Sequence, residues 1–271
     1  MLVGGAEGSV VPGRLVLRGP RALYVGPLQC RRLHSLHALT VVVGLHHPFL
    51  LRVGGRGGFC ETRSAVIRPG TPHELYSGSA GLAMLLVQPE THGCLAAVRA
   101  LPAGGVDALS TVEQRRVRSL VDEAPGVGRD GGGQDRSGEV HALVDAVAEV
   151  VLPALRRGAP AAILDPRIRD VLRHLWSGAD LDLSELAGAC GVSPSRLTHL
   201  FRQETGTSPR QYRSWVRLRS ALDALWSRQS LTDLAHATGF ADSAHLSRTV
   251  GHMLGSTPSD LRRSVIAVGA R

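Results

Sequence analysis

The sequence predicts a multidomain α+β protein, with a β-rich N-terminal half and an all-α C-terminal half. Short segments rich in Val, Leu and Ile, punctuated by Gly and Pro, fill residues 1–95. Two amphipathic helical patterns follow, and two copies of a helix–turn–helix pattern then lie within residues 165–265. At 271 residues the chain is long enough for two domains, each with its own core.

Six strands are predicted in the N-terminal half. Each is short and ends near a turn signal such as Gly19-Pro20 or Pro69-Gly70. Many short strands with tight turns favour a closed β-barrel or a sandwich. The predicted strands are 14–18, 22–25, 38–45, 49–53, 64–68 and 82–87.

Two helices are predicted in residues 96–157, over 106–123 and 139–155. The Gly-rich stretch 125–138 between them is predicted to be a mobile loop, and 158–164 to be a linker. Little barrel surface is left to cover the two apolar stripes, so we expect them to pair two subunits. The stripe residues are Val112, Val117, Leu120 and Val121, then Leu143, Val147, Val150 and Val151.

The helix–turn–helix units run from Leu183 to Phe201 and from Leu231 to Val250. Each has a small alanine and, four residues later, a glycine suited to the left-handed position after a helix. Each also has polar residues that suit the starts of its two helices. The alanine–glycine pairs are Ala187 with Gly191 and Ala235 with Gly239. The starting residues are Asp182 with Glu185, Ser193 with Pro194, Ser230 with Asp233, and Asp242.

With these units joined by one long helix, the C-terminal half resembles the AraC/XylS family of bacterial transcription regulators. The family usually has Phe where this chain has Leu246, Val250 and Leu254, but all three are apolar. The resemblance implies two recognition helices that read neighbouring stretches of major groove. The other matching residues are Ser208-Pro209, Tyr212, Arg217-Leu218, Ala221, Gly239-Phe240 and Gly255-Ser256-Thr257-Pro258.

By this resemblance, exposed residues of the recognition helices are candidates for contact with DNA. Arginine reads guanine through bidentate hydrogen bonds, whereas Ser and His make more adaptable contacts. Arg202, Arg210 and Arg213 suit phosphate contacts or plain surface charge. The alternative is that each is an ordinary solvated helix residue. The candidates are Ser195, Arg196, Thr198, His199 and Arg202 in the first unit, and Ser243, Ala244, His245, Ser247 and Arg248 in the second.

The stretch from Ala65 to His73 resembles the second conserved motif of cupin barrels, which are the usual sensor half of this family. The fold expected is therefore a cupin-like β-barrel with two flanking helices. In cupins an H-x-H pair, a Glu and a later His hold a metal. Here Arg32 and Ala38 stand where the first His and the Glu would be, and only His34 and His73 match. We expect these two histidines to face a small-molecule effector, with no metal and no cofactor.

Composition sets outer limits on the function. The formal net charge is +8, and all 31 basic residues are arginine. This balance favours contact with phosphates. The four cysteines form no CxxC pair, so we expect free thiols in a reducing compartment. No leader peptide and no apolar run of about 18 residues is evident, which predicts a cytoplasmic protein without membrane contact.

The function expected is sequence-specific transcription regulation, through promoter DNA, a small-molecule effector and a homodimer. Family resemblance adds RNA polymerase as a partner and makes activation the expected mode. A repressor or dual regulator is the alternative. A metal-dependent cupin enzyme with an accessory DNA-binding domain is a further alternative, which Arg32 and Ala38 disfavour. No Ser-His-Asp or paired-carboxylate pattern predicts a catalytic residue.

Overall fold

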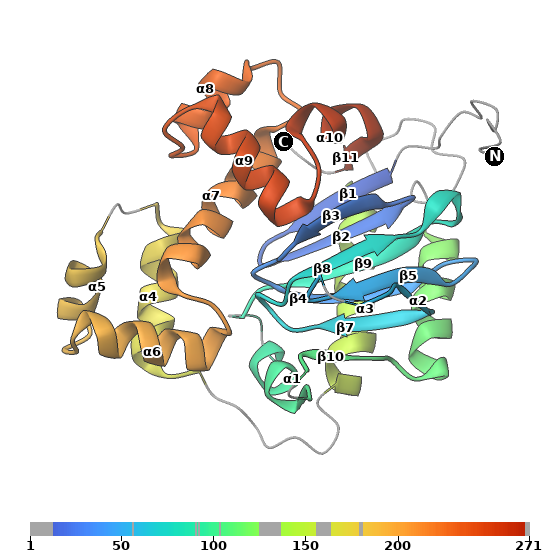
Figure 1. Ribbon diagram of the computed structural model, residues 1–271, viewed down its shortest axis with the longest axis horizontal. Coiled ribbons are helices and arrows are strands. Elements are labelled where there is room, and N and C mark those ends of the chain that lie inside the picture. Colours follow the sequence, from blue (N-terminus) through green and yellow to red (C-terminus); the bar gives the residue numbers. More distant parts are fainter. Residues whose placement is uncertain are drawn as a thin grey trace.

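The computed structural model places a two-sheet β domain beside an all-helical domain (Figure 1). It describes residues 13–55, 57–89, 91, 93–102, 104–124, 137–155, 164–178 and 181–268. Residues 125–136 of the predicted loop over 125–138, and residues 158–163 of the predicted linker over 158–164, lie outside these ranges.

The β domain consists of two facing sheets. The larger has seven strands in the order β10-β7-β4-β9-β2-β1-β11, and the smaller has four in the order β3-β8-β5-β6. All six predicted strands are present. The sequence reading missed five others, which are β3, β6, β8, β10 and β11. The bounds are β1 Gly13–Arg18, β2 Arg21–Gly26, β3 Gln29–His34, β4 Leu39–Gly44, β5 Phe49–Val53, β6 Cys60–Thr62, β7 Ser64–Ile67, β8 His73–Tyr76, β9 Leu82–Val87, β10 Val106–Asp107 and β11 Val265–Val268.

The central strands of the larger sheet are apolar on both faces. In β4, Val42 belongs to the core between the two sheets, whereas Val41 and Val43 belong to a second core on the outer face. Strands β4 and β9 are buried along their whole length. A strand covered on both sides has no solvent-facing positions, so it reads as a continuous apolar run.

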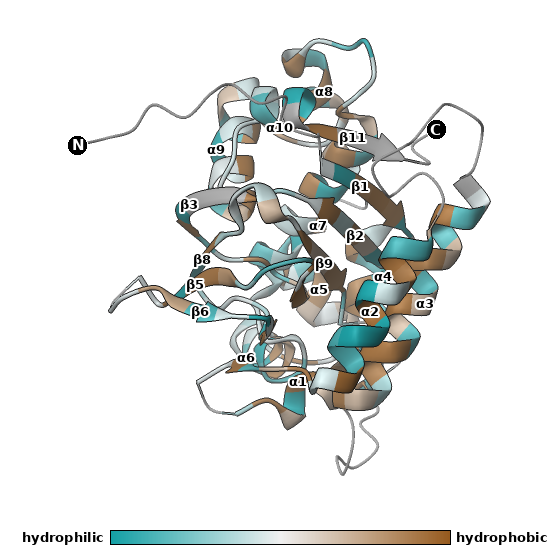
Figure 2. Cartoon of the chain, turned by 90° about the vertical axis from the view of Figure 1, so that its right-hand side faces the viewer, coloured by the Kyte–Doolittle hydropathy of each residue, from teal (hydrophilic) through white to brown (hydrophobic). Residues whose placement is uncertain are grey.

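Helices cover the outer face of this sheet. These are α1 Cys94–Ala100, α2 Thr111–Glu123 and α3 Ser137–Leu155. In Figure 2, α2 and α3 lie side by side along the sheet. The predicted first helix starts too early, because Val106 and Asp107 form β10 beside β7 and the helix begins after Ser110. Helix α1 was not predicted.

The expectation that the two helical stripes lack barrel surface to cover them is wrong. Val117 and Val121 are 1% and 3% exposed and pack with Val41 and Val147 against the outer face of the sheet. Val112, assigned to the same stripe, is 55% exposed. The stripes therefore complete the core of one subunit.

The helical domain has seven helices among its described residues. Helices α5 and α6 form the first helix–turn–helix unit, α8 and α9 form the second, and α7 joins them. The units are as the sequence predicted. The bounds are α4 Pro166–Trp176, α5 Leu183–Ala189, α6 Pro194–Thr205, α7 Pro209–Ala224, α8 Leu231–Ala237, α9 Ser243–Leu254 and α10 Pro258–Ser264.

The end of the chain returns to the β domain. Strand β11 pairs in parallel with β1, with Gly13 opposite Val265. Trp226, just after α7, donates its indole N–H to the carbonyl oxygen of Val265 at 2.9 Å. The division at 165–265 is thus not a clean structural boundary, because the seven-stranded sheet takes its edge strand from beyond the last helix.

Candidate nucleic-acid interface

The first recognition helix, α6, begins and ends at local signals. The Ser193 hydroxyl accepts the Arg196 N–H at 3.2 Å, and Pro194 occupies the first turn. Before it, Asp182 and Glu185 form a reciprocal capping box at the start of α5. Gly191 in the turn has φ +64°, a conformation that disfavours any side chain. These caps hold the turn between the two helices in place.

The outer side of α6 presents most of the predicted contact residues. Leu197 and Phe201 are fully buried on the inner side. The Thr198 side chain is half-buried, and its hydroxyl donates to the Pro194 carbonyl at 2.9 Å. The four exposed candidates are Ser195, Arg196, His199 and Arg202.

The second recognition helix, α9, begins where Asp242 accepts the His245 N–H at 2.5 Å. Ala244 and Arg248 are exposed, whereas Ser243, His245 and Ser247 are half-buried. The His245 ring packs edge-on against Phe240 with centroids 5.2 Å apart, and the Ser247 hydroxyl donates to the Ser243 carbonyl at 2.8 Å. Arg248 is therefore the exposed cationic side chain among the candidates on this helix.

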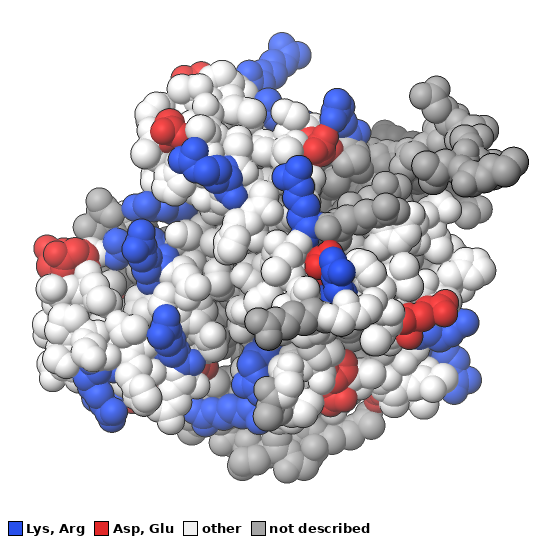
Figure 3. Space-filling view, in the orientation of Figure 1, with Lys and Arg blue, Asp and Glu red and all other residues white. Residues whose placement is uncertain are grey.

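Helix α7 fixes how the two units sit relative to each other. Tyr212 and Trp215 are completely buried on it, and the Trp176 indole of α4 donates to the Tyr212 hydroxyl at 3.1 Å. Figure 3 shows arginine side chains spread over the visible face of the helical domain, with fewer acidic ones among them. Such a face favours phosphate contact.

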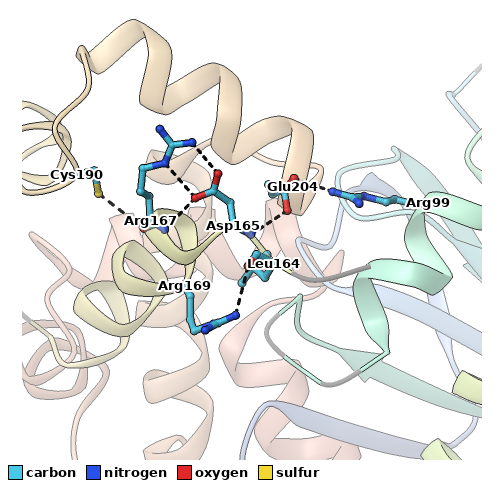
Figure 4. A network of polar contacts seen from close by, with 7 residues as sticks. All are labelled: Arg99, Leu164, Asp165, Arg167, Arg169, Cys190 and Glu204. Carbon is cyan, nitrogen blue, oxygen red and sulfur yellow. Dashed lines mark hydrogen bonds and ion pairs between the residues drawn. The ribbon is translucent and has the colours of Figure 1, made fainter. Parts of the chain in front are cut away.

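The β domain contacts the C-terminal end of α6. The Arg99 guanidinium of α1 pairs with the Glu204 carboxylate in the last turn of α6 at 2.7 Å (Figure 4). The other carboxylate oxygen of Glu204 accepts the Asp165 N–H at 3.4 Å, where α4 begins. Asp165 caps α4 through the Arg167 N–H, and the Arg167 side chain holds the pKa of Asp165 below its usual range.

Two loops of the β domain contact the corner between α6 and α7. His37 is buried, and its Nδ1 lies 3.1 Å from the Thr207 hydroxyl. Gly206 ends α6 with φ +77° and lies close to Pro69. A Cβ added at this glycine would be 3.5 Å from the Pro69 side chain. Near the C-terminal end of α9, the Ser35 N–H donates to the His252 carbonyl at 3.3 Å. Both recognition helices are thus held at their C-terminal ends by the β domain.

Arg219 of α7 makes a further contact between the domains. Its side chain is 3% exposed, and one guanidinium nitrogen donates to the carbonyl oxygens of Gly19 and Arg21, both at 2.8 Å. The sequence patterns predict no role for Glu204 or Arg219. No local signal marks them, because their partners are distant along the chain.

The two candidate effector histidines lie together. His34 and His73 are opposite each other on β3 and β8, with ring centroids 4.3 Å apart. Each ring places Nδ1 near a carbonyl oxygen of its own chain, Arg32 at 3.0 Å and Thr71 at 2.9 Å. Burial lowers the pKa of His34 and lowers that of His73 to about 3, and the neighbouring His34 acts in the same direction on His73. Both rings are therefore neutral near pH 7.

The Nε2 atom of His73 is buried and makes no hydrogen bond within the described structure. A neutral ring whose Nδ1 donates to a carbonyl leaves Nε2 as an acceptor. The Nε2 atom of His73 can thus accept a hydrogen bond from a ligand that reaches it. No three His, Cys, Asp or Glu side chains converge in a metal-binding arrangement within the part of the chain that is described.

Comparisons with known proteins agree with this geometry. Residues 186–264 match the protein-family model described as "Helix-turn-helix domain". The chain is 36% identical over 124 residues to "HTH-type transcriptional regulator GlxA" of Rhizobium meliloti, covering 44% of this chain and 38% of that protein. It is 31% identical over 103 residues to the "Arabinose operon regulatory protein" of Salmonella typhimurium, covering 36% of this chain and 37% of that protein. The matched stretch spans less than half of each of these relatives.

The whole architecture also has a known counterpart. The crystal structure of ToxT from Vibrio cholerae superimposes with a TM-score of 0.57, at 9% identity, over 91% of this chain and 98% of that one. At that identity the likeness concerns the fold alone. A wild-type ToxT structure bound to an unsaturated fatty acid has a TM-score of 0.55 at 10% identity, covering 91% of this chain and 96% of that one.

The fold and the exposed recognition helices define the C-terminal half as a tandem helix-turn-helix domain. Its sequence is similar to that of the arabinose operon regulatory protein, in line with its resemblance to the AraC/XylS family. The names of these relatives are those of regulatory proteins. No described helix is both long enough and apolar enough to cross a membrane.

Proposed function

We propose that this protein is a transcription regulator that reads promoter DNA through α6 and α9. The observation that carries the proposal is the pair of recognition helices joined rigidly by α7, each with an exposed arginine on its outer side, Arg196 and Arg248. Two such helices suit two successive major grooves on one face of the duplex. The relatives named as transcription regulators support this function.

The test uses the full chain. Selection from random duplexes is expected to yield a site of roughly 16–20 base pairs with two conserved blocks. Arg248→Ala is expected to weaken binding by about 1–3 kcal/mol and to relax preference in one block only, and Arg196→Ala in the other. Arg173→Ala on α4 is a matched control, because this exposed arginine is paired with Asp170. Selection that enriches no sequence at physiological salt would contradict the proposal.

The β domain is proposed to be the sensor for a small organic effector. The buried His34–His73 pair supports this, since Nε2 of His73 is a buried acceptor that no described group uses. The fatty acid bound to ToxT is one example of a ligand in this fold. His73→Asn keeps a donor for the Thr71 carbonyl but removes the Nε2 acceptor, so it is expected to weaken the response to effector and leave basal DNA binding intact.

The metal content of the protein distinguishes a sensor domain from the alternative of a metal-dependent cupin enzyme. Elemental analysis of protein purified without added metal is expected to find no stoichiometric zinc, iron or copper. Metal that is lost with EDTA together with regulation would favour a metal site at His34 and His73 instead.

Two subunits are proposed to pair through the outer groove between α2 and α3, a space of about 440 Å³ that includes Leu120 and Val150. Arg116 and Glu149 on the same surface offer opposite charges to a second copy. Light scattering is expected to show a dimer that Leu120→Asp converts to folded monomers. A wild-type monomer at micromolar concentration, with and without DNA, would count against pairing.

Activation through RNA polymerase, in the bacterial cytoplasm, completes the proposal and rests on family resemblance. A reporter that rises when the protein is expressed supports activation. A fall would instead favour the repressor alternative.

A further inference from the structure

A groove lies between the second recognition helix and the start of the linking helix. It has a volume of about 520 Å³ and is lined from three directions. Arg248 and His252 come from α9, Arg210 and Ser214 come from the first turns of α7, and His37 comes from the β domain. The groove also abuts the corner where α6 ends and α7 begins, so it lies between the two helix-turn-helix units.

The chemistry of this groove suits an oxyanion. Arg210 and Arg248 are both exposed, and none of the described residues that line it is acidic. Ser208, Gln211 and Thr249 add hydroxyl and amide groups, and Met253 adds an apolar side chain. Asp242 is the carboxylate that interacts with Arg248, and that carboxylate already accepts the His245 N–H at the start of α9. Two guanidinium groups that border one open groove attract an anion into it.

We propose that this groove binds one phosphodiester of the DNA backbone, in the segment between the two major grooves that α6 and α9 read. The inference rests on the proposed function and adds a phosphate contact that does not depend on base sequence. Arg210 supplies the main contact, and Arg248 adds positive charge at the edge of the groove.

The position of His37 gives the site a second consequence. This side chain belongs to the β domain, yet it lines the groove and lies 3.1 Å from Thr207 at the α6–α7 corner. Burial, with His252 nearby, lowers the pKa of His37 to about 4, so the ring is neutral near pH 7 and adds no charge to the groove. The β domain thus forms one wall of the proposed phosphate site. A shift of the 35–38 loop would therefore directly alter the contact with the DNA backbone.

The experiment measures binding of the full chain to its selected site and to a random duplex across a range of salt concentrations. Arg210→Ala is expected to weaken binding to both duplexes on the order of tenfold. It is also expected to make the slope of log K against log salt shallower by about 1, because one fewer counterion is released. Ser214→Asp, which places a carboxylate in the groove, is expected to weaken both further. Arg173→Ala is the control and is expected to change neither.

A backbone-specific readout locates the contact. Replacing single phosphates with neutral methylphosphonates across the centre of the site is expected to weaken wild-type binding at one position. Arg210→Ala is expected to be insensitive at that same position.

Each outcome separates this inference from the proposed function. If Arg210→Ala and Ser214→Asp bind both duplexes as wild type does, the groove is not a phosphate site, although sequence-specific binding stands. If wild type shows no sequence preference but Arg210→Ala still makes the salt slope shallower, the groove stands and sequence-specific regulation fails. A chain that binds no duplex at all overturns both.

Discussion

Arg99 and Glu204 form a 2.7 Å ion pair that joins the β domain to the end of a recognition helix. The Glu204 side chain is 9% exposed and the Arg99 side chain 47%, so the carboxylate depends on its partner more than the guanidinium does. This pair, together with the contacts of His37 and Arg219, holds the helical domain against the β domain. The β domain thus positions α6 and α7 in addition to its proposed role as a sensor.

Arg99→Ala is expected to lower the free energy of unfolding by about 1 kcal/mol, because it leaves the Glu204 carboxylate largely buried without its cation, while the exposure of Arg99 limits the effect. Urea unfolding measures it. Arg173→Ala is the matched control: its pair with Asp170 has side chains 68% and 53% exposed. Equal effects from the two variants would mean that burial of Glu204 contributes nothing.

Val117→Asp and Val112→Asp test which side of α2 packs into the core of the subunit. Val117 is 1% exposed, so a carboxylate there is expected to destabilise the folded subunit by about 3 kcal/mol or more. Val112 is 55% exposed, and its substitution is expected to change stability by less than about 0.5 kcal/mol. Thermal unfolding with light scattering distinguishes lost folding from lost pairing. A folded, monomeric Val117→Asp variant would restore the idea that this stripe pairs subunits.

Arg219→Met is expected to cost on the order of 2 kcal/mol, because the carbonyl oxygens of Gly19 and Arg21 lose their shared donor. The loss is expected to appear as faster amide hydrogen exchange in β1 and β2. Arg219→Lys keeps the charge but cannot reproduce the planar guanidinium, so we expect an intermediate effect. Exchange that rises only in the helical domain would show that Arg219 mainly supports α7.

Stability is expected to fall as the solution is acidified below about pH 6.5. The pKa of His37 is lowered to about 4 and that of His73 to about 3, each chiefly by burial. The unfolded chain binds protons at these sites at a higher pH than the folded chain does. The histidine contribution is therefore complete above the unfolded pKa of about 6.5 and is lost as pH falls through the folded values.

Between roughly pH 4.5 and 6, each of these histidines is expected to add about 1.4 kcal/mol per pH unit to the slope of stability against pH. Urea unfolding of wild type, His37→Gln and His73→Asn across this range measures the slope. His46→Gln, at an exposed site, is the control. Slopes that are the same in all four proteins would show that the two buried histidines do not become protonated on unfolding.

The sequence predicted the helix-turn-helix units correctly because their signals are local. The caps at Asp182, Ser193 and Asp242, and the left-handed turns at Gly191 and Gly239, depend on residues a few positions away. The strands it missed have weaker local signals. Strand β8 includes two buried polar residues, His73 and Glu74, the second neutralised by a bidentate pair with Arg52 from β5. That pairing exists only once the sheet has formed.

By itself, the sequence predicted a β-rich half, an all-α half and two helix-turn-helix units, together with exposed residues such as Arg196 and Arg248. The tertiary structure decided what covers each apolar face and which distant residues meet. The stripe containing Val117 packs on the larger sheet, β11 pairs with β1, and Glu204 meets Arg99. Hydrophobic periodicity shows that a helix has a side to bury, but burial is non-directional and does not name the partner. Only the folded chain brings such distant residues within contact distance.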